Sequence, residues 1–213
     1  MALIVTQHWS ANLISMTYEI SAGDTAWVLT SAALVLLMTP GLAFFYGGMV
    51  RAKGVLNMLM MNFVTMGTVG VLWVLYGYSM AFGNSIGGLI GDPFQYAGLS
   101  MLMNPDALVG TIPSLAFVVF QSAFAIIAVA LISGSIADRT SFTAWTVFTV
   151  LWSLLVYFPA AHWVFAFDGV ASETGGWIAN TVKAIDFAGG TAVHINAGVA
   201  GLVSDQPPPS GPV

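Results

Sequence analysis

The sequence of 213 residues contains no cysteine and few charged residues. Without cysteine there can be neither a disulfide framework nor a thiolate metal site. Lys, Arg, Asp and Glu make up 6% of the chain, whereas a soluble domain carries about 25%. So few charges could not cover the surface of a soluble protein, and the net charge of −5 removes the basic surface that nucleic-acid binding requires. These absences exclude a cytosolic enzyme and a nucleic-acid-binding protein.

Histidine is scarce as well, with three residues at positions 8, 162 and 194. None of them is paired at the spacing of four residues that brings two helical metal ligands together. We therefore expect no metal site and no cofactor. The apolar stretches also lack a nucleophile beside a base, which argues against a membrane-embedded enzyme. His162, next to Trp163 at the end of an apolar stretch, is expected to have a structural or interfacial role.

Apolar residues are abundant: 58% of the chain is hydrophobic and the mean hydropathy is +0.88. A helix needs about 20 apolar residues to cross a bilayer core, where backbone groups must bond internally. Five apolar stretches predict such helices, and the fifth is short and marginal. We expect an all-α fold, a polytopic membrane helix bundle of about five spans. The stretches are 26–49, 55–82, 112–137, 142–167 and 186–203.

Three parts of the chain differ in composition. Residues 1–24 are mixed and lack the positive region of a signal peptide, so we interpret them as an extracytoplasmic lead. Residues 25–203 form the membrane domain. Residues 204–213 include three consecutive prolines, which favour a disordered tail. The odd number of spans and this tail predict a truncated or altered C-terminus, because many transporters contain a second, inverted repeat.

The basic residues predict the orientation in the membrane. Arg51, Lys53 and Arg139 lie in loops on one side of the predicted bundle, and Lys183 alone lies on the other. Loops rich in Lys and Arg stay in the cytoplasm, so the N-terminus is expected outside. Aromatic residues near the outer end of the second span are expected to form an interfacial belt. They are Trp73, Tyr76 and Tyr78.

Titratable side chains at membrane depth are costly and suggest function. Asp186 opens the fifth stretch, His194 lies deeper in it, and Asn196 is close by. On one helix, Asp186 and His194 would lie on neighbouring faces and could line one path. Asp186 could equally cap the helix N-terminus. The alternative for His194 is a buried ring bonded to a backbone carbonyl, and its depth favours a function.

Three phenylalanines, Phe117, Phe120 and Phe124, recur on one face of the third span. An aromatic face can hold a small cation, and stacked rings can also close a path as a hydrophobic constriction. On spacing alone, a core or lipid-facing stripe is the better interpretation.

Longer stretches resemble the ammonium transporter family, the Amt/Mep/Rh proteins, and are most similar to bacterial Amt members. The resemblance implies subunits of eleven transmembrane helices, built from two inverted five-helix halves and one further helix. It also implies a homotrimer with one pore in each subunit, of which this chain holds the first half. The matching stretches are TPGLAFFYGGMVRAKGVLNML (39–59), LWVLYGYSMAFG (72–83), FQSAFAIIAVALISGSIADR (120–139), FPAAHWVF (158–165) and DFAGGTAVHINAGVAGL (186–202).

The resemblance also implies roles for single residues. Phe120 corresponds to the family residue that borders the outer ammonium recruitment site, and Phe124 to part of the phenyl gate beneath it. Asp186 matches the acidic residue at the recruitment site. His194 matches the first of the two pore histidines.

Three further residues are pore candidates. Phe165 stands where many members have a tryptophan at the outer vestibule, and this change weakens a cation–π contact there. Phe45 matches an aromatic residue of the first span near the inner pore, and Asn196 lies close to His194. The family's second gate phenylalanine, a vestibule serine, the partner histidine and the C-terminal tail have no counterpart in this chain.

The function implied is ammonium transport through a hydrophobic pore that is incomplete in this chain. The family context implies the plasma membrane of a bacterium, that is, its inner membrane, and a PII-type signal protein as a regulatory partner. Two alternatives stay open: an ammonium sensor without flux, and a fragment with no function of its own.

Overall fold

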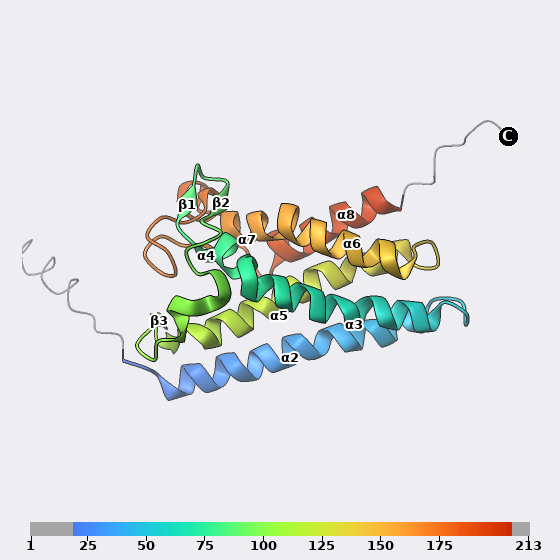
Figure 1. Cartoon of the computed structure of the whole chain (residues 1–213), viewed down its shortest axis with the longest axis horizontal. Coiled ribbons are helices and arrows are strands. Elements are labelled where there is room, and N and C mark those ends of the chain that lie inside the picture. The colour runs from blue at the N-terminus through green and yellow to red at the C-terminus, as the bar shows by residue number, and fades with distance from the viewer. Residues whose placement is uncertain (1–18, 206–213) are drawn as a thin grey trace, which may run out of the picture.

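The structure is a computed structural model that describes residues 19–205, and it is a bundle of long helices with loops gathered at one end (Figure 1). Helix α2 packs against α3 and α5. The spans are α2 (Ala22–Gly47); α3 (Val55–Leu72) with η1 (Trp73–Gly77) and α4 (Tyr78–Phe82); α5 (Ser114–Ile132) with η3 (Ser133–Ile136); and α6 (Phe142–Trp152) with η4 (Ser153–Tyr157) and α7 (Phe158–Phe165).

Within residues 19–205, four helices are long and apolar enough to cross a membrane: Ala22–Gly47, Val55–Phe82, Ser114–Ile136 and Phe142–Phe165. They confirm the first four predicted spans to within a few residues at each end. The fifth predicted stretch, 186–203, is helical only from Gly190. There η6 (Gly190–Ile195) and α8 (Asn196–Ser204) form one helix, and residues 186–189 precede it.

The second and fourth spans each contain a π-helical turn, η1 and η4, where one extra residue widens the helix. The η4 turn comes directly before α7, which has Pro159 in its first turn. Gly77 at the end of η1 lies against the ring of Phe158, and a Cβ there would be 2.6 Å from the ring's Cζ. Glycine therefore allows the two widened helices to approach.

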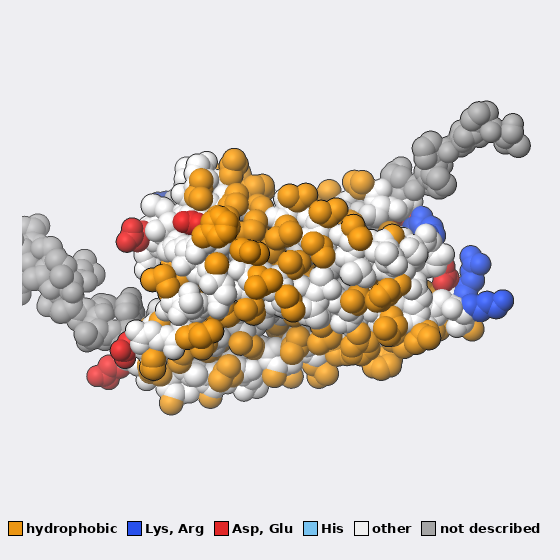
Figure 2. Space-filling view, in the orientation of Figure 1, with side chains coloured by type: hydrophobic (Ala, Val, Ile, Leu, Met, Phe, Trp, Pro, Cys, Tyr) orange, Lys and Arg blue, Asp and Glu red, His pale blue; other side chains and the backbone are white. Residues whose placement is uncertain are grey.

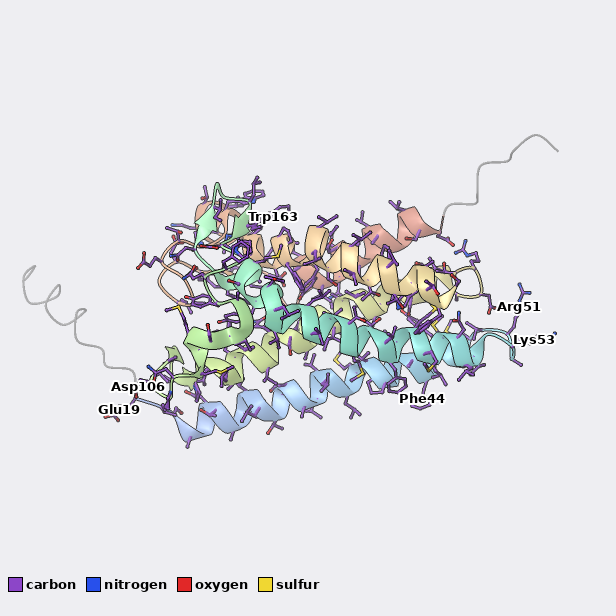
Figure 3. All side chains as sticks on the ribbon, in the orientation of Figure 1. Glu19, Phe44, Arg51, Lys53, Asp106 and Trp163 are labelled. Carbon is purple, nitrogen blue, oxygen red and sulfur yellow. The ribbon has the colours of Figure 1, made fainter. Side chains whose placement is uncertain are left out.

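Short elements form the loops at one end of the bundle. The β1–β2 hairpin is tied to α7, because Trp163 Nε1 donates to the Leu89 carbonyl at 2.6 Å (Figure 3). Tyr96 donates to the Ala171 carbonyl at 3.1 Å, and burial raises the pKa of its hydroxyl. The elements are β1 (Ser85–Ile86), β2 (Ile90–Gly91), η2 (Ala97–Met103), β3 (Leu108–Val109), β4 (Ile112–Pro113) and η5 (Ile178–Val182).

Charge is divided between the two ends of the bundle, with an apolar middle (Figure 2). We call the end with Arg51, Lys53 and Arg139 the basic end. We call the opposite end, which carries the loops around Asp106 and Asp168, the acidic end. This division is what a helix bundle crossing a bilayer requires, because charged side chains cannot stay in hydrocarbon without cost.

The predicted aromatic belt is wrong for two of its three residues. Trp73 and Tyr78 are each 1% exposed, and they pack edge-on against each other in the core. Tyr76 is exposed. Apolar aromatic rings stabilise a helix–helix interface as well as a membrane interface, so position along the span does not separate the two.

Most of the predicted lead and tail, residues 1–18 and 206–213, lies outside the described residues, and the predictions for them stay predictions.

Candidate functional site: an apolar groove with one histidine

A cavity of about 350 Å³ lies between α2, α5 and the start of η6. Among the described residues that line it, only His194 has a polar side chain. We call this cavity the central groove. The other lining residues are Met38, Gly41, Leu42, Phe45, Phe124, Ile127, Leu131, Ala188 and Val193.

A second cavity, of about 770 Å³, shares Leu131 and His194 with the central groove and continues to Arg139 and Asp205 at the basic end. Tyr46 lies on its wall and donates from its hydroxyl to the Leu131 carbonyl at 3.1 Å. His194 therefore stands where an apolar cavity meets a more polar one.

The backbone before η6 positions His194. Ala188 and Gly189 both have positive φ, of 53° and 73°, so the chain turns sharply before the helix begins. His194 Nδ1 lies 3.1 Å from the Gly189 carbonyl oxygen. A carbonyl only accepts, so this geometry assigns the proton of the neutral ring to Nδ1 and leaves Nε2 as an acceptor. The ring is bonded to a carbonyl but exposed, so it is not a buried structural histidine.

The side chain of Asp186 caps η6, although Asp186 itself precedes the helix. Its Oδ2 accepts from the backbone N–H groups of Thr191 and Ala192, at 3.0 and 3.1 Å. The capping interpretation is confirmed, but Asp186 lies before the helix rather than at its first position. Asp186 and His194 therefore do not share one helix, and the prediction that they occupy neighbouring faces is wrong.

The second carboxylate oxygen of Asp186, Oδ1, is buried and has no hydrogen-bond partner among residues 19–205. Asp186 and Phe165 line a third cavity, of about 300 Å³, at the acidic end, together with Phe167 and Lys183. A buried carboxylate oxygen without a partner carries a desolvation penalty that a cation or a hydrogen-bond donor would remove.

The stripe of three phenylalanines divides between two environments. Phe117 packs against Phe82 at a ring distance of 5.0 Å and belongs to the core. Phe120 and Phe124 pack edge to face at 4.9 Å, and Phe124 lines the central groove. The structure thus brings Phe124, Phe45 and His194 together, with Phe120 next to them.

Two other polar residues, Asn196 and His162, lie outside the central groove. Asn196 lines none of the three cavities, and its Nδ2 is buried without a partner in the described part of the chain. His162 is fully buried, with Nδ1 3.0 Å from the Ala81 carbonyl oxygen and Nε2 3.0 Å from Ser85 Oγ. It joins α7 to α4 and β1, which fits the structural role expected for it. Within residues 19–205, no three His, Asp or Glu side chains are close enough to hold a metal ion.

Sequence reasoning missed the residues at the basic side of the groove. Tyr46 follows Phe45 directly, and the sequence indicates for Arg139 only the orientation of its loop. Their contribution depends on how α2, η3 and α8 approach each other, which no local pattern in the sequence reports. A tyrosine at the end of an apolar span is the one signal that could have marked Tyr46.

The sequence model of the Ammonium Transporter Family matches residues 26–205. The chain belongs to the ammonium transporter family. An ammonium transporter of Mycobacterium tuberculosis is 62% identical over 196 residues, which cover 85% of this chain and 41% of that protein. An ammonium transporter of Aquifex aeolicus is 46% identical over 204 residues, which cover 94% of this chain and 45% of that protein. The chain therefore spans less than half the length of these relatives.

Solved structures give the same result. The crystal structure of Candida albicans Mep2 is similar with a TM-score of 0.74 at 29% identity, over 86% of this chain and 38% of that chain. A sensor Amt protein is similar with a TM-score of 0.69 at 26% identity, over 80% of this chain and 40% of that chain. The family resemblance and the all-α membrane fold are thus confirmed, and this family member is a multi-pass membrane protein.

Proposed function

We propose that this chain forms one wall of a pore that conducts ammonium nitrogen across a bacterial plasma membrane as neutral ammonia. The observation that carries the proposal is the central groove, an apolar cavity in which His194 is the one polar side chain among the described lining residues. An ion in such a groove loses its hydration and has few groups to replace it. Ammonia is uncharged and avoids most of this cost, whereas potassium has no uncharged form.

In this proposal, ammonium enters the pore at the acidic end. Asp186 and Phe165 line the third cavity, and a carboxylate beside an aromatic face can attract a cation there. An ammonium ion held there by aromatic faces and a carboxylate is gathered before it is deprotonated. Phe124, packed edge to face on Phe120, would then separate this site from the groove.

His194 handles hydrogen bonding and the proton inside the groove. With Nδ1–H bonded to Gly189, Nε2 can accept a hydrogen bond from ammonia, or it can accept the proton that ammonium gives up and then return it. In this scheme, Phe45 forms part of the wall of the groove, and Asn196 lies outside it, two residues after His194 in the chain.

The family context extends the proposal. The complete protein would be a homotrimer with one pore in each subunit, regulated by a PII-type signal protein. The basic end would face the cytoplasm of the bacterium, because loops that carry Arg51, Lys53 and Arg139 follow the positive-inside rule. The N-terminus would then lie outside.

The test uses a chimaera in which residues 26–203 replace the matching half of the M. tuberculosis relative. We expect the chimaera in liposomes to take up labelled methylammonium and to exclude potassium, and the 213-residue chain alone to show no specific uptake. His194→Ala should lower the uptake by about a hundredfold, because a positioned acid–base group contributes at least that factor. A chimaera that folds but shows no flux would favour the sensor alternative.

Ile195→Ala is the matched control, because Ile195 is exposed next to His194 and lines none of the three cavities. Its uptake should equal that of the unaltered chimaera. If His194→Ala also transports methylammonium at the unaltered rate and still excludes potassium, the role given to the imidazole is wrong.

A further inference from the structure

A fourth cavity lies at the basic end, outside the central groove. It measures about 760 Å³ and is formed where the α2–α3 and η3–α6 connections meet. Three of the four Lys and Arg residues of the whole chain line it. Its lining residues are Arg51, Ala52, Lys53, Gly54, Asn57, Asp138, Arg139, Thr140 and Ser141.

The charges in this basic cavity are only partly neutralised. Arg51 Nε lies 3.6 Å from Asp138 Oδ2, and the Arg51 side chain is 88% exposed, so its two terminal nitrogens stay available. Arg139 pairs with Asp205. Lys53 is exposed and forms no ion pair among the described residues (Figure 3). Positive charge therefore exceeds negative charge even when both carboxylates are counted.

The cavity also sits at the right depth for a membrane phosphate. The second span begins at Val55 and the fourth at Phe142, directly beside the cavity. Side chains just outside a span meet the layer of lipid headgroups. Basic pockets between transmembrane helices at this level bind anionic headgroups.

We propose that the basic cavity binds a phosphate group. Arg51 and Lys53 would hold its oxygens through charge-assisted hydrogen bonds, with Arg139 adding positive potential from the opposite loop. The phosphate can come from an anionic lipid of the adjoining leaflet or from a soluble phosphate compound, and the same residues would recognise either. Bound phosphate would link the α2–α3 and η3–α6 connections, which Asp138 and Arg51 already join.

The experiment compares two single-charge variants of the 213-residue chain. Lys53→Gln removes a basic charge from the cavity, and Lys183→Gln removes the same charge from the acidic end. Each protein is placed in phosphatidylcholine nanodiscs with or without phosphatidylglycerol, and native mass spectrometry counts the anionic lipids that each chain retains. Inorganic phosphate is titrated in a second arm by calorimetry. Circular dichroism confirms that each variant is folded.

We expect Lys53→Gln to lower the affinity about fivefold and Lys183→Gln to leave it unchanged, since one basic residue near the membrane surface contributes about this factor. If Lys53→Gln loses affinity only in the phosphatidylglycerol arm, the bound phosphate comes from a lipid. If Lys53→Gln loses affinity only in the inorganic phosphate arm, the bound phosphate comes from a soluble compound. If the unaltered chain binds neither, or if both variants lose affinity equally, the site does not exist and the basic residues act only through their overall charge.

Discussion

The carboxylate of Asp186 has two possible roles, and substitution can separate them. As a cap, it accepts hydrogen bonds from the N–H groups of Thr191 and Ala192 through one oxygen. As an electrostatic element, it offers the unpartnered Oδ1 to a cation. Asp186→Ala removes both roles. Asp186→Asn keeps a carbonyl oxygen that can accept the same backbone hydrogen bonds but removes the charge.

The expected magnitudes follow from these contacts. Loss of a capping side chain costs about 1 kcal/mol, and loss of the interaction between a carboxylate and the helix dipole adds about 0.3–1 kcal/mol. We therefore expect Asp186→Ala to lower the free energy of unfolding by about 2 kcal/mol. Asp186→Asn should lower it by less than about 1 kcal/mol, because the hydrogen bonds stay and only the charge term is lost. Both variants should lose methylammonium uptake in the chimaera.

Unfolding of the chain in mixed micelles, followed by far-ultraviolet circular dichroism, measures the stability. Asp106→Ala is the control, since Asp106 lies at the same acidic end and its carboxylate forms no hydrogen bond in the described residues (Figure 3). It should change neither stability nor uptake. If Asp186→Asn folds normally and transports at the unaltered rate, the charge has no part in recruiting ammonium. If Asp186→Ala is as stable as the unaltered chain, the cap contributes nothing.

Two further predictions concern packing, and both are measured as the same unfolding free energy. Trp145→Phe should destabilise the chain by about 2 kcal/mol, because Trp145 is fully buried and donates to the Met61 carbonyl at 2.8 Å. The control is Trp27→Phe, at a residue 73% exposed, which should change the free energy of unfolding by less than about 0.5 kcal/mol. An equal effect of the two substitutions would contradict the reasoning. Gly134→Ala should lower the free energy of unfolding by about 1–3 kcal/mol, because its Cβ would lie 2.6 Å from the ring of Tyr46. Unchanged stability would mean that η3, with Gly134, and α2, with Tyr46, separate easily.

The sequence predicts the spans well because their limits depend on composition alone. Val55–Phe82 coincides with the predicted 55–82, and the next span differs from 112–137 only at its ends. An apolar run bounded by glycine, proline or charge determines where a helix can lie in a bilayer. Phe124, Phe45 and His194, which the family resemblance singled out, line one cavity, and their roles in transport stay predictions.

The sequence does not predict which way each apolar side chain faces. Lipid and a neighbouring helix are both apolar, so hydropathy is the same for Trp73 in the core and for Phe44, which is 66% exposed (Figure 3). The fifth predicted stretch shows a second feature that the sequence does not predict. The start of its helix at Gly190 depends on two residues with positive φ and on a carboxylate that reaches forward to cap the helix, and neither feature changes the composition of the stretch.

Polar atoms, rather than apolar surface, determine what can lie opposite the groove. The exposed apolar faces of α2 are equally stable against lipid or protein, so they require no partner in a membrane. The exposed Nε2 of His194 is different, because a hydrocarbon chain cannot donate a hydrogen bond to it. The surface facing His194 must therefore supply water, ammonia or a polar side chain. This requirement is consistent with the proposed passage of ammonia, a small neutral molecule that carries its own N–H groups.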